Sequence, residues 1–236
     1  ALLMGVTTAQ ALSFAWNKPL LGVNHVDAHL YAAMMSDGAQ NLFPALGVVL
    51  SGGHTFLSRI DEIGSYEILG TTVDDAVGEA FDKVATMIDL PYPGGPHIEK
   101  LALKGDPYRY PFKAGSVKKN RLDFSFSGLK TNVLYTVKGN KANKMSSSLI
   151  SDEDKKDVAA SFQHAALSDI VEKAKIAVAN FPCQAIYLGG GVTCNQYLRK
   201  LFSEKLEPSY PLFWPPKGLS LDNGAMIAGL GFHLYK

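Results

Sequence analysis

The sequence predicts an α/β fold, because short apolar runs typical of buried strands alternate with longer segments of helical apolar spacing. Two of the strand-like runs, residues 45–50 and 185–188, lead directly into glycine-rich turns. The 236 residues are 47% hydrophobic and 19% charged. That is enough apolar material to bury the core of one large domain or of two modest ones.

Helices are predicted where apolar residues recur at helical spacing between capping residues, prolines or glycines. These segments are residues 2–15, 26–35, 75–88, 98–103, 154–180, 195–206 and 223–235. Asn24 is a good N-cap for the second helix, and Ser151 with Asp154 forms a capping-box pattern before the fifth. Strands are predicted at residues 20–23, 45–50, 55–60 and 185–188.

The amino-acid composition narrows the class of protein but does not identify one class. The 23 basic and 22 acidic residues leave a net charge of +1, which neither indicates nor excludes a nucleic-acid partner. No apolar run approaches the ~20 residues of a transmembrane helix, and no signal-peptide pattern is visible. Two isolated cysteines favour a reducing cytoplasm. The chain begins inside a predicted helix, so we interpret it as a piece of a longer protein.

His25 and His29 are four residues apart at the start of a predicted helix, so their imidazoles share one face and are close enough to bind one metal ion. The alternative is one core histidine and one surface histidine. A zincin protease needs glutamate directly after the first histidine, where this sequence has Val26. Asp222, before the last predicted helix, is the candidate third ligand; its alternative role is an N-cap.

Two glycine turns are candidates for binding phosphate or nucleotide. Residues 51–54 join two apolar strands, and residues 189–191 follow a buried strand and precede a helix. Glycines let the backbone approach a ligand closely and direct successive N–H groups at an anion. A plain hairpin turn is the alternative for the first, and the second lacks the spacing of a Rossmann fingerprint.

An acidic face runs along the predicted helix of residues 75–88, where Asp75, Glu79 and Asp82 fall on neighbouring positions. Acids in the first helical turn are explained by the helix dipole, which accounts for Asp74 and Asp75. It does not account for Asp82, which comes shortly before a Pro- and Gly-rich turn at residues 91–96 whose backbone could cover a ligand.

Longer strings contain these residues and follow one another along the chain. They are NHVDAH (24–29), SGGHT (51–55), DDAVGEAFDK (74–83), PYPGGP (91–96), FSFSGLKT (124–131), GGVTCN (190–195) and DNGAMIA (222–228). Together they resemble the tRNA threonylcarbamoyl transferase family, TsaD, once labelled O-sialoglycoprotein endopeptidase. The resemblance is to the bacterial type and covers nearly the whole chain, but the family's N-terminal segment with its opening phosphate loop is missing.

The resemblance implies the actin/Hsp70-like ATPase (ASKHA) fold with two RNase H-like lobes, the first of them incomplete. Residues 1–110 would be the remainder of the N-terminal lobe, with the metal-binding histidines and the phosphate turn. Residues 111–236 would be the C-terminal lobe, with the adenosine-binding turn and the metal-binding aspartate. Without its N-terminal segment, the chain is expected to close less well around its substrate.

The resemblance also implies the reaction and its residues. The family transfers a threonylcarbamoyl group from threonylcarbamoyl-adenylate to the exocyclic amine of the adenosine beside the anticodon of ANN-decoding tRNAs. One divalent ion, iron or zinc, would be bound by His25, His29 and Asp222. The adenylate would be bound by Val49, Leu50, Ser51, Gly52, Gly53, Asp82, Gly95, Glu99 and Asn195. No residue is identified as the general base.

The implied partners are tRNA, a paralogous TsaB-type scaffold protein and a TsaE-type ATPase. From the residues themselves, two basic segments are candidates for contact with tRNA, residues 113–121 and 138–144. Solvated surface loops are the alternative for both segments. Two alternatives to the transferase remain at this point, a non-catalytic scaffold paralogue and a metallopeptidase.

Overall fold

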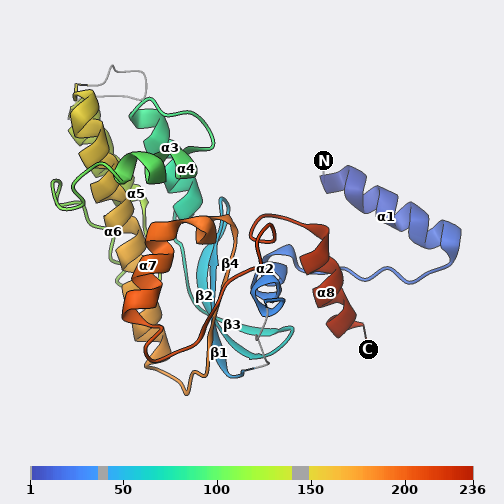
Figure 1. Ribbon diagram of the computed structural model, residues 1–236. Coiled ribbons are helices and arrows are strands. Elements are labelled where there is room, and N and C mark those ends of the chain that lie inside the picture. Colours follow the sequence, from blue (N-terminus) through green and yellow to red (C-terminus); the bar gives the residue numbers. More distant parts are fainter. Residues whose placement is uncertain (1, 37–41, 140–148, 236) are drawn as a thin grey trace.

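A single five-stranded sheet organises the computed structural model, which describes residues 2–36, 42–139 and 149–235 (Figure 1). The strand order is β3-β2-β1-β4-β5. The strands are β1 (Ala45–Leu50), β2 (Thr55–Glu62), β3 (Ser65–Thr71), β4 (Ile186–Gly189) and β5 (Leu212–Phe213). β1, β2 and β3 pair antiparallel, whereas β4 pairs parallel with both β1 and β5.

Helices cover both faces of the sheet, which explains why β1 is apolar at every position (Figure 1). Leu46, Val48 and Leu50 point into the larger core, whereas Ala45 and Val49 face α2. The helices are α1 (Leu2–Trp16), α2 (His25–Met34), α3 (Val77–Met87), α4 (Gly94–Ala102), α5 (Ser127–Lys138), α6 (Asp152–Val178), α7 (Gln196–Lys205) and α8 (Gly224–Leu234). A 3₁₀ turn, η1 (Gly191–Cys194), follows β4.

The helix predictions from periodicity and capping are confirmed to within a few residues for all but α4, which begins at Gly94, four residues before its predicted start. The Asp82 carboxylate accepts a hydrogen bond from the Gly94 N–H at 2.7 Å, and this tertiary contact starts the helix inside the Pro- and Gly-rich stretch. The capping box of Ser151 and Asp154 is present as predicted.

Four elements differ from the sequence expectation. Residues 20–23 form no strand, because they connect α1 to α2 without a neighbouring strand. β3, β5 and α5 were not predicted. β3 has a mostly exposed, irregular pattern with register shifts, and β5 is only two residues long, so neither shows the alternation of a typical strand.

The sheet extends across the predicted lobe division at residue 110. β1, β2 and β3 precede that position and β4 and β5 follow it, yet all five belong to one sheet. The division at residue 110 is therefore not a boundary of this sheet. Strand pairing between segments over a hundred residues apart leaves no local signal in the sequence.

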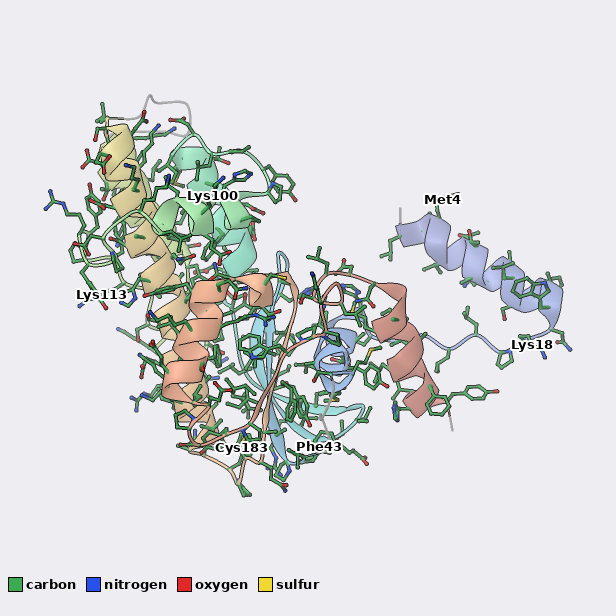
Figure 2. All side chains as sticks on the ribbon, in the orientation of Figure 1. Met4, Lys18, Phe43, Lys100, Lys113 and Cys183 are labelled. Carbon is green, nitrogen blue, oxygen red and sulfur yellow. The ribbon has the colours of Figure 1, made fainter. Side chains whose placement is uncertain are left out.

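The first helix stands apart from the rest of the molecule. α1 has no buried residue, and Met4 on it lies well away from the sheet (Figure 2). Large apolar side chains such as Phe14, 90% exposed, point into solvent. In the described part of the chain, no helix combines the length and apolarity required to span a bilayer. Cys183 and Cys194 are both free thiols.

Candidate metal and nucleotide site

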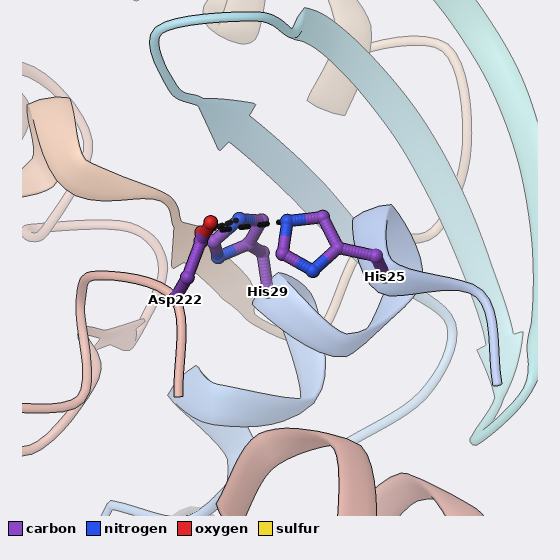
Figure 3. Close-up of side chains that lie close together, drawn as sticks. All are labelled: His25, His29 and Asp222. Carbon is purple, nitrogen blue, oxygen red and sulfur yellow. Dashed lines mark ion pairs between the residues drawn. The ribbon is translucent and has the colours of Figure 1, made fainter. Parts of the chain in front are cut away.

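The start of α2 presents two imidazoles on one face of the helix. Asn24 caps the helix by accepting a hydrogen bond from the Val26 N–H at 2.9 Å, which fixes the first turn. His25 and His29 then lie one turn apart with ring centroids 4.8 Å from each other (Figure 3). The local sequence therefore produces the paired arrangement that the spacing predicted.

Asp222 reaches the same point from the loop before α8 (Figure 3). Its neighbour Asn223, and not Asp222, caps that helix, with its side-chain oxygen accepting from the Met226 N–H at 2.9 Å. The Asp222 carboxylate is thus free of the capping role that sequence reasoning held open for it. The Asp222 side chain is 76% exposed, and its carboxylate points toward both histidines.

Two of the three separations between the candidate ligand atoms match those expected around a tetrahedral ion. Asp222 Oδ1 lies 3.4 Å from His25 Nε2 and 3.3 Å from His29 Nε2. Two atoms each about 2.1 Å from a tetrahedral metal are roughly 3.4 Å apart. All three ligand atoms lie within 4.8 Å of one another. The donor set of two imidazoles and one carboxylate fits iron or zinc equally well.

Burial keeps His29 in the form that can bind a metal. Its side chain is 2% exposed, and desolvation, with a smaller contribution from neighbouring His25, lowers the pKa of His29. A neutral imidazole has a free lone pair but no positive charge for Asp222 to attract. The other ring nitrogen, Nδ1, is buried and has no hydrogen-bond partner among the described residues.

A pocket of about 290 Å³ lies where the two glycine turns meet. β1 and β4 are parallel neighbours, so the turns that follow them lie at one edge of the sheet, the usual position of ligands in such sheets. Gly190 has φ +93°, and a Cβ there would be 2.4 Å from the Leu50 carbonyl oxygen, so this close approach requires glycine. Leu221 lines the pocket, and Asp222 follows it in the chain. The metal cluster and the pocket therefore share one loop.

Comparison with known proteins identifies the family of this chain. The family model described as tRNA N6-adenosine threonylcarbamoyltransferase, TsaD, matches residues 1–229. A protein of that name from Protochlamydia amoebophila is 58% identical over all of this chain, and one from Chlamydia pneumoniae is 48% identical over 98% of it. The chain belongs to the TsaD family. It spans about two thirds of the length of these relatives, covering 68% and 66% of them.

Solved structures confirm the fold class. The crystal structure of T. kodakarensis HypF has a TM-score of 0.71 at 16% identity, covering 98% of this chain and 39% of that one. Full-length HypF in its phosphate- and nucleotide-bound form has a TM-score of 0.68 at 14% identity, covering 93% of this chain and 37% of that one. The chain has the actin/Hsp70-like ATPase fold. As a TsaD-family member it is an acyltransferase that threonylcarbamoylates tRNA.

The pocket brings together five of the nine substrate residues expected from the TsaD resemblance. These five are Gly52, Asp82, Gly95, Glu99 and Asn195. The other four do not line it: Val49 and Leu50 are fully buried in β1, and Ser51 and Gly53 flank Gly52 in its turn. The Ser51 hydroxyl holds that turn in shape by accepting from the N–H groups of Gly53 and His54.

Three of the five TsaD pocket residues also bind the protein's own backbone. Asp82 accepts from the Gly94 N–H, and Glu99 accepts from the Gln196 N–H at 2.6 Å. Asn195 caps α7 through the Leu198 N–H at 2.9 Å. These contacts join α3, α4 and α7 around the pocket. Each carboxylate keeps a second oxygen that can accept from a ligand.

Sequence reasoning missed several pocket-lining side chains. Phe81, Cys194 and Leu221 line the pocket but were not predicted as TsaD site residues. All three lie directly beside predicted residues, namely Asp82, Asn195 and Asp222. Apolar side chains and a lone thiol carry no sequence signal of binding, and only their position in the fold reveals them.

Proposed function

We propose that this chain binds threonylcarbamoyl-adenylate in the pocket between the two glycine turns. From there it passes the threonylcarbamoyl group to the exocyclic amine of the adenosine beside the anticodon of ANN-decoding tRNAs. The observation that carries the proposal is the position of the His25, His29 and Asp222 cluster next to that pocket. A metal site and a glycine-lined pocket joined by one loop suit acyl transfer from an adenylate.

His25, His29 and Asp222 would hold one divalent ion, iron or zinc. When bound, such an ion supplies a Lewis acid that polarises the carbamoyl carbonyl or neutralises the leaving phosphate. The protein's part is to keep three ligand atoms converging before the ion binds. The buried position of His29 and the capped start of α2 serve that purpose.

The pocket residues have separate roles in binding the adenylate. A Cβ at Gly52 or Gly53 would meet no atom within 4 Å, so a phosphate can come close to the backbone of this turn. The N-termini of α3 and α4 border the pocket through Gly78 and Gly95, and helix N-termini favour negative charge. The free oxygens of Asp82 and Glu99 suit ribose hydroxyls or the amine of the threonyl group.

The reaction itself is a simple displacement. The tRNA amine nitrogen attacks the carbamoyl carbon, the bond from that carbon to the phosphate oxygen breaks, and adenylate leaves with the electron pair. The amine loses one proton. Holding both reactants in the pocket replaces an encounter in solution by a pre-oriented one.

Two alternatives have less support. A non-catalytic scaffold paralogue has no need of a converging metal triad, yet this chain keeps His25, His29 and Asp222 within 4.8 Å of one another. A metallopeptidase of the zincin type needs a glutamate where Val26 stands. The relatives from Protochlamydia amoebophila and Chlamydia pneumoniae are named as the transferase, which also favours it over both alternatives.

For tRNA, the basic loop of residues 113–121 is the proposed contact surface. Lys113, Lys118, Lys119 and Arg121 make no ion pair with any other described residue. The second segment proposed from sequence, residues 138–144, lies outside the described residues except for Lys138 and Gly139. A TsaB-type scaffold, a TsaE-type ATPase and a cytoplasmic location complete the proposal.

Metal content tests the proposal most directly. His29→Ala should reduce bound iron or zinc from about one ion per chain to almost none, because a buried ligand is lost from a three-residue site. Elemental analysis of the purified protein measures this. His97→Ala, a histidine on α4 outside the cluster, is the matched control and should retain the metal. Equal metal content in the two variants would refute the assignment.

A further inference from the structure

The contact between α2 and α8 lies immediately behind the metal cluster. We infer that the close approach of Gly229 to Tyr31 sets the distance between Asp222 and the two histidines, which makes Tyr31 a positioning residue for the metal. The inference rests on the proposed function, since it concerns the same three ligands. It adds two residues that bind neither metal nor substrate.

Asp222 moves with α8, because hydrogen bonds tie its loop to the start of that helix. The Asn223 side-chain oxygen accepts from the Met226 N–H at 2.9 Å. Its side-chain nitrogen donates to the carbonyls of Leu219 at 3.2 Å and Leu221 at 2.8 Å. Asp222 lies between these anchored residues, so a shift of α8 carries its carboxylate along.

The two histidines move with α2, which packs on α8 through small or fully buried side chains. Ala28 and Ala32 of α2 meet Met226 and Leu230 of α8 in one buried cluster. Ala28 lies between the histidines in sequence, so this helix pair is continuous with the metal site. The spacing of the two helices therefore determines how far Asp222 is from the imidazoles.

Gly229 of α8 and Tyr31 of α2 approach each other closely. A Cβ at Gly229 would lie 2.3 Å from the Tyr31 ring carbon Cε1, far inside contact distance. The Tyr31 hydroxyl and His233 Nε2 are 3.1 Å apart and their rings are 5.3 Å apart, so the ring packs against the same helix that carries Gly229. Tyr31 follows His29 by two residues on the same helix. A steric clash with the Tyr31 ring would therefore displace α2, the helix that carries His25 and His29.

The test is the Zn²⁺ affinity of the purified chain, measured by competition with a chromophoric chelator. Gly229→Ala should weaken binding about 10-fold or more, because metal sites tolerate ligand displacements of only about 0.2 Å and supporting residues typically contribute 10–100-fold. Gly224→Ala is the matched control. It lies on the same helix and nearer to Asp222, but a Cβ there meets nothing within 4 Å. Its affinity should equal that of the parent.

A second substitution distinguishes positioning from general damage. Tyr31→Leu added to Gly229→Ala removes the ring that the new methyl group strikes, so the double variant should bind Zn²⁺ more tightly than Gly229→Ala alone. If Gly229→Ala is folded, as judged by circular dichroism, and binds Zn²⁺ as tightly as the parent, the inference is wrong. It is also wrong if Gly224→Ala loses as much Zn²⁺ affinity as Gly229→Ala. Failure of the double variant to recover affinity also overturns it.

Two further outcomes separate this inference from the proposed function. A parent chain that binds no Zn²⁺ overturns the proposed metal site, and this inference with it. If the parent binds Zn²⁺ and Gly229→Ala binds it equally well, only this inference is overturned. Should Gly229→Ala not fold, Tyr31→Phe replaces it, since it removes only the hydroxyl that faces His233. Parent-like affinity of Tyr31→Phe would then refute the proposal.

Discussion

The imidazole of His29 and the amide of Asn195 are both buried, but they differ in how their polar atoms are satisfied. His29 Nδ1 has no hydrogen-bond partner among the described residues, and its Nε2 faces the Asp222 carboxylate at 3.3 Å. Asn195 accepts from the Leu198 N–H and donates to the Gln163 side chain at 2.8 Å. A buried polar atom without a partner is costly, whereas a satisfied one stabilises the fold.

Asn195 is therefore predicted to stabilise the fold as well as to border the pocket. Asn195→Ala should lower the free energy of unfolding by about 1–2 kcal/mol through loss of the α7 cap, and it leaves the Gln163 amide without its partner. Urea denaturation measures the change. Asn195→Asp keeps an equivalent cap acceptor, so it should retain the contribution of the cap but not that of the bond to Gln163. An Ala variant as stable as the parent would show that the cap contributes nothing.

At the scale of elements, the adjacent acids Asp74 and Asp75 join α3 to α5. Asp74 accepts hydrogen bonds from the Ser125 hydroxyl at 2.6 Å and the Phe126 N–H at 2.8 Å, just before α5 begins. Asp75, 12% exposed, pairs with Lys83 of α3 at 2.7 Å and with Lys130 of α5. The DDAVGEAFDK and FSFSGLKT strings are thus complementary parts of one contact, and much of their specificity is structural.

Asp75 is expected to make stability depend on pH at the acid end. Burial raises the pKa of Asp75, but hydrogen bonds from Lys130 and Lys83 outweigh it and hold the pKa below its usual value. Stability from a lowered carboxyl pKa is present above the unfolded pKa of about 3.9 and is lost as pH falls through the folded pKa. Asp75→Asn should lower the unfolding free energy at pH 7 by about 1.5–3 kcal/mol.

The difference in unfolding free energy between the parent and Asp75→Asn should become smaller as pH falls below about 4. Thermal denaturation between pH 3 and pH 7 measures it. Glu79→Gln is the control, since Glu79 pairs with the same Lys83 but is 45% exposed, and exposed pairs contribute little. If the difference in unfolding free energy between the parent and Asp75→Asn stays constant across this pH range, the ion pairs of Asp75 are not the cause of that difference.

How much of this fold could be predicted from the sequence depends on whether a signal is local. The spacing of His25 and His29, the Asn24 cap and the Ser151 capping box are local, and the structure contains all of them. The capping of α5 by Asp74 joins positions 51 and 52 residues apart and could not be predicted from either segment alone. The early start of α4 depends on Asp82 in the same way.

The site could be predicted only in part for the same reason. Residue spacing and motif resemblance supplied the three candidate metal ligands, which the structure brings together, and five residues that line the pocket. It could not show that Asn223, and not Asp222, caps α8, or that Gly229 of α8 lies too close to Tyr31 for a larger residue. Those facts come from packing between elements.

At the scale of the whole molecule, a net charge of +1 provides no general attraction for tRNA, so contact must depend on where charge is concentrated. The basic loop of residues 113–121 is such a place. Asn120 anchors it by donating to the Leu69 carbonyl at 2.8 Å, and Asp123 accepts from the Thr71 N–H at 2.9 Å. Lys113 lies beside α6, across the molecule from α1 and α8 (Figure 2). The loop thus presents unpaired charge on a fixed support.

Changing Lys118, Lys119 and Arg121 together to Ala should weaken tRNA binding and flatten its salt dependence, because each lost phosphate contact removes about 0.7–0.9 from the slope of log affinity against log salt. Filter binding at several salt concentrations measures both. The control replaces Lys175, Lys200 and Lys205, which are already ion-paired with Glu172 or Glu204, and should leave the slope unchanged. Because the loop is separate from the metal ligands, Zn²⁺ affinity should match the parent in both variants. A slope equal to that of the parent would place the tRNA surface elsewhere.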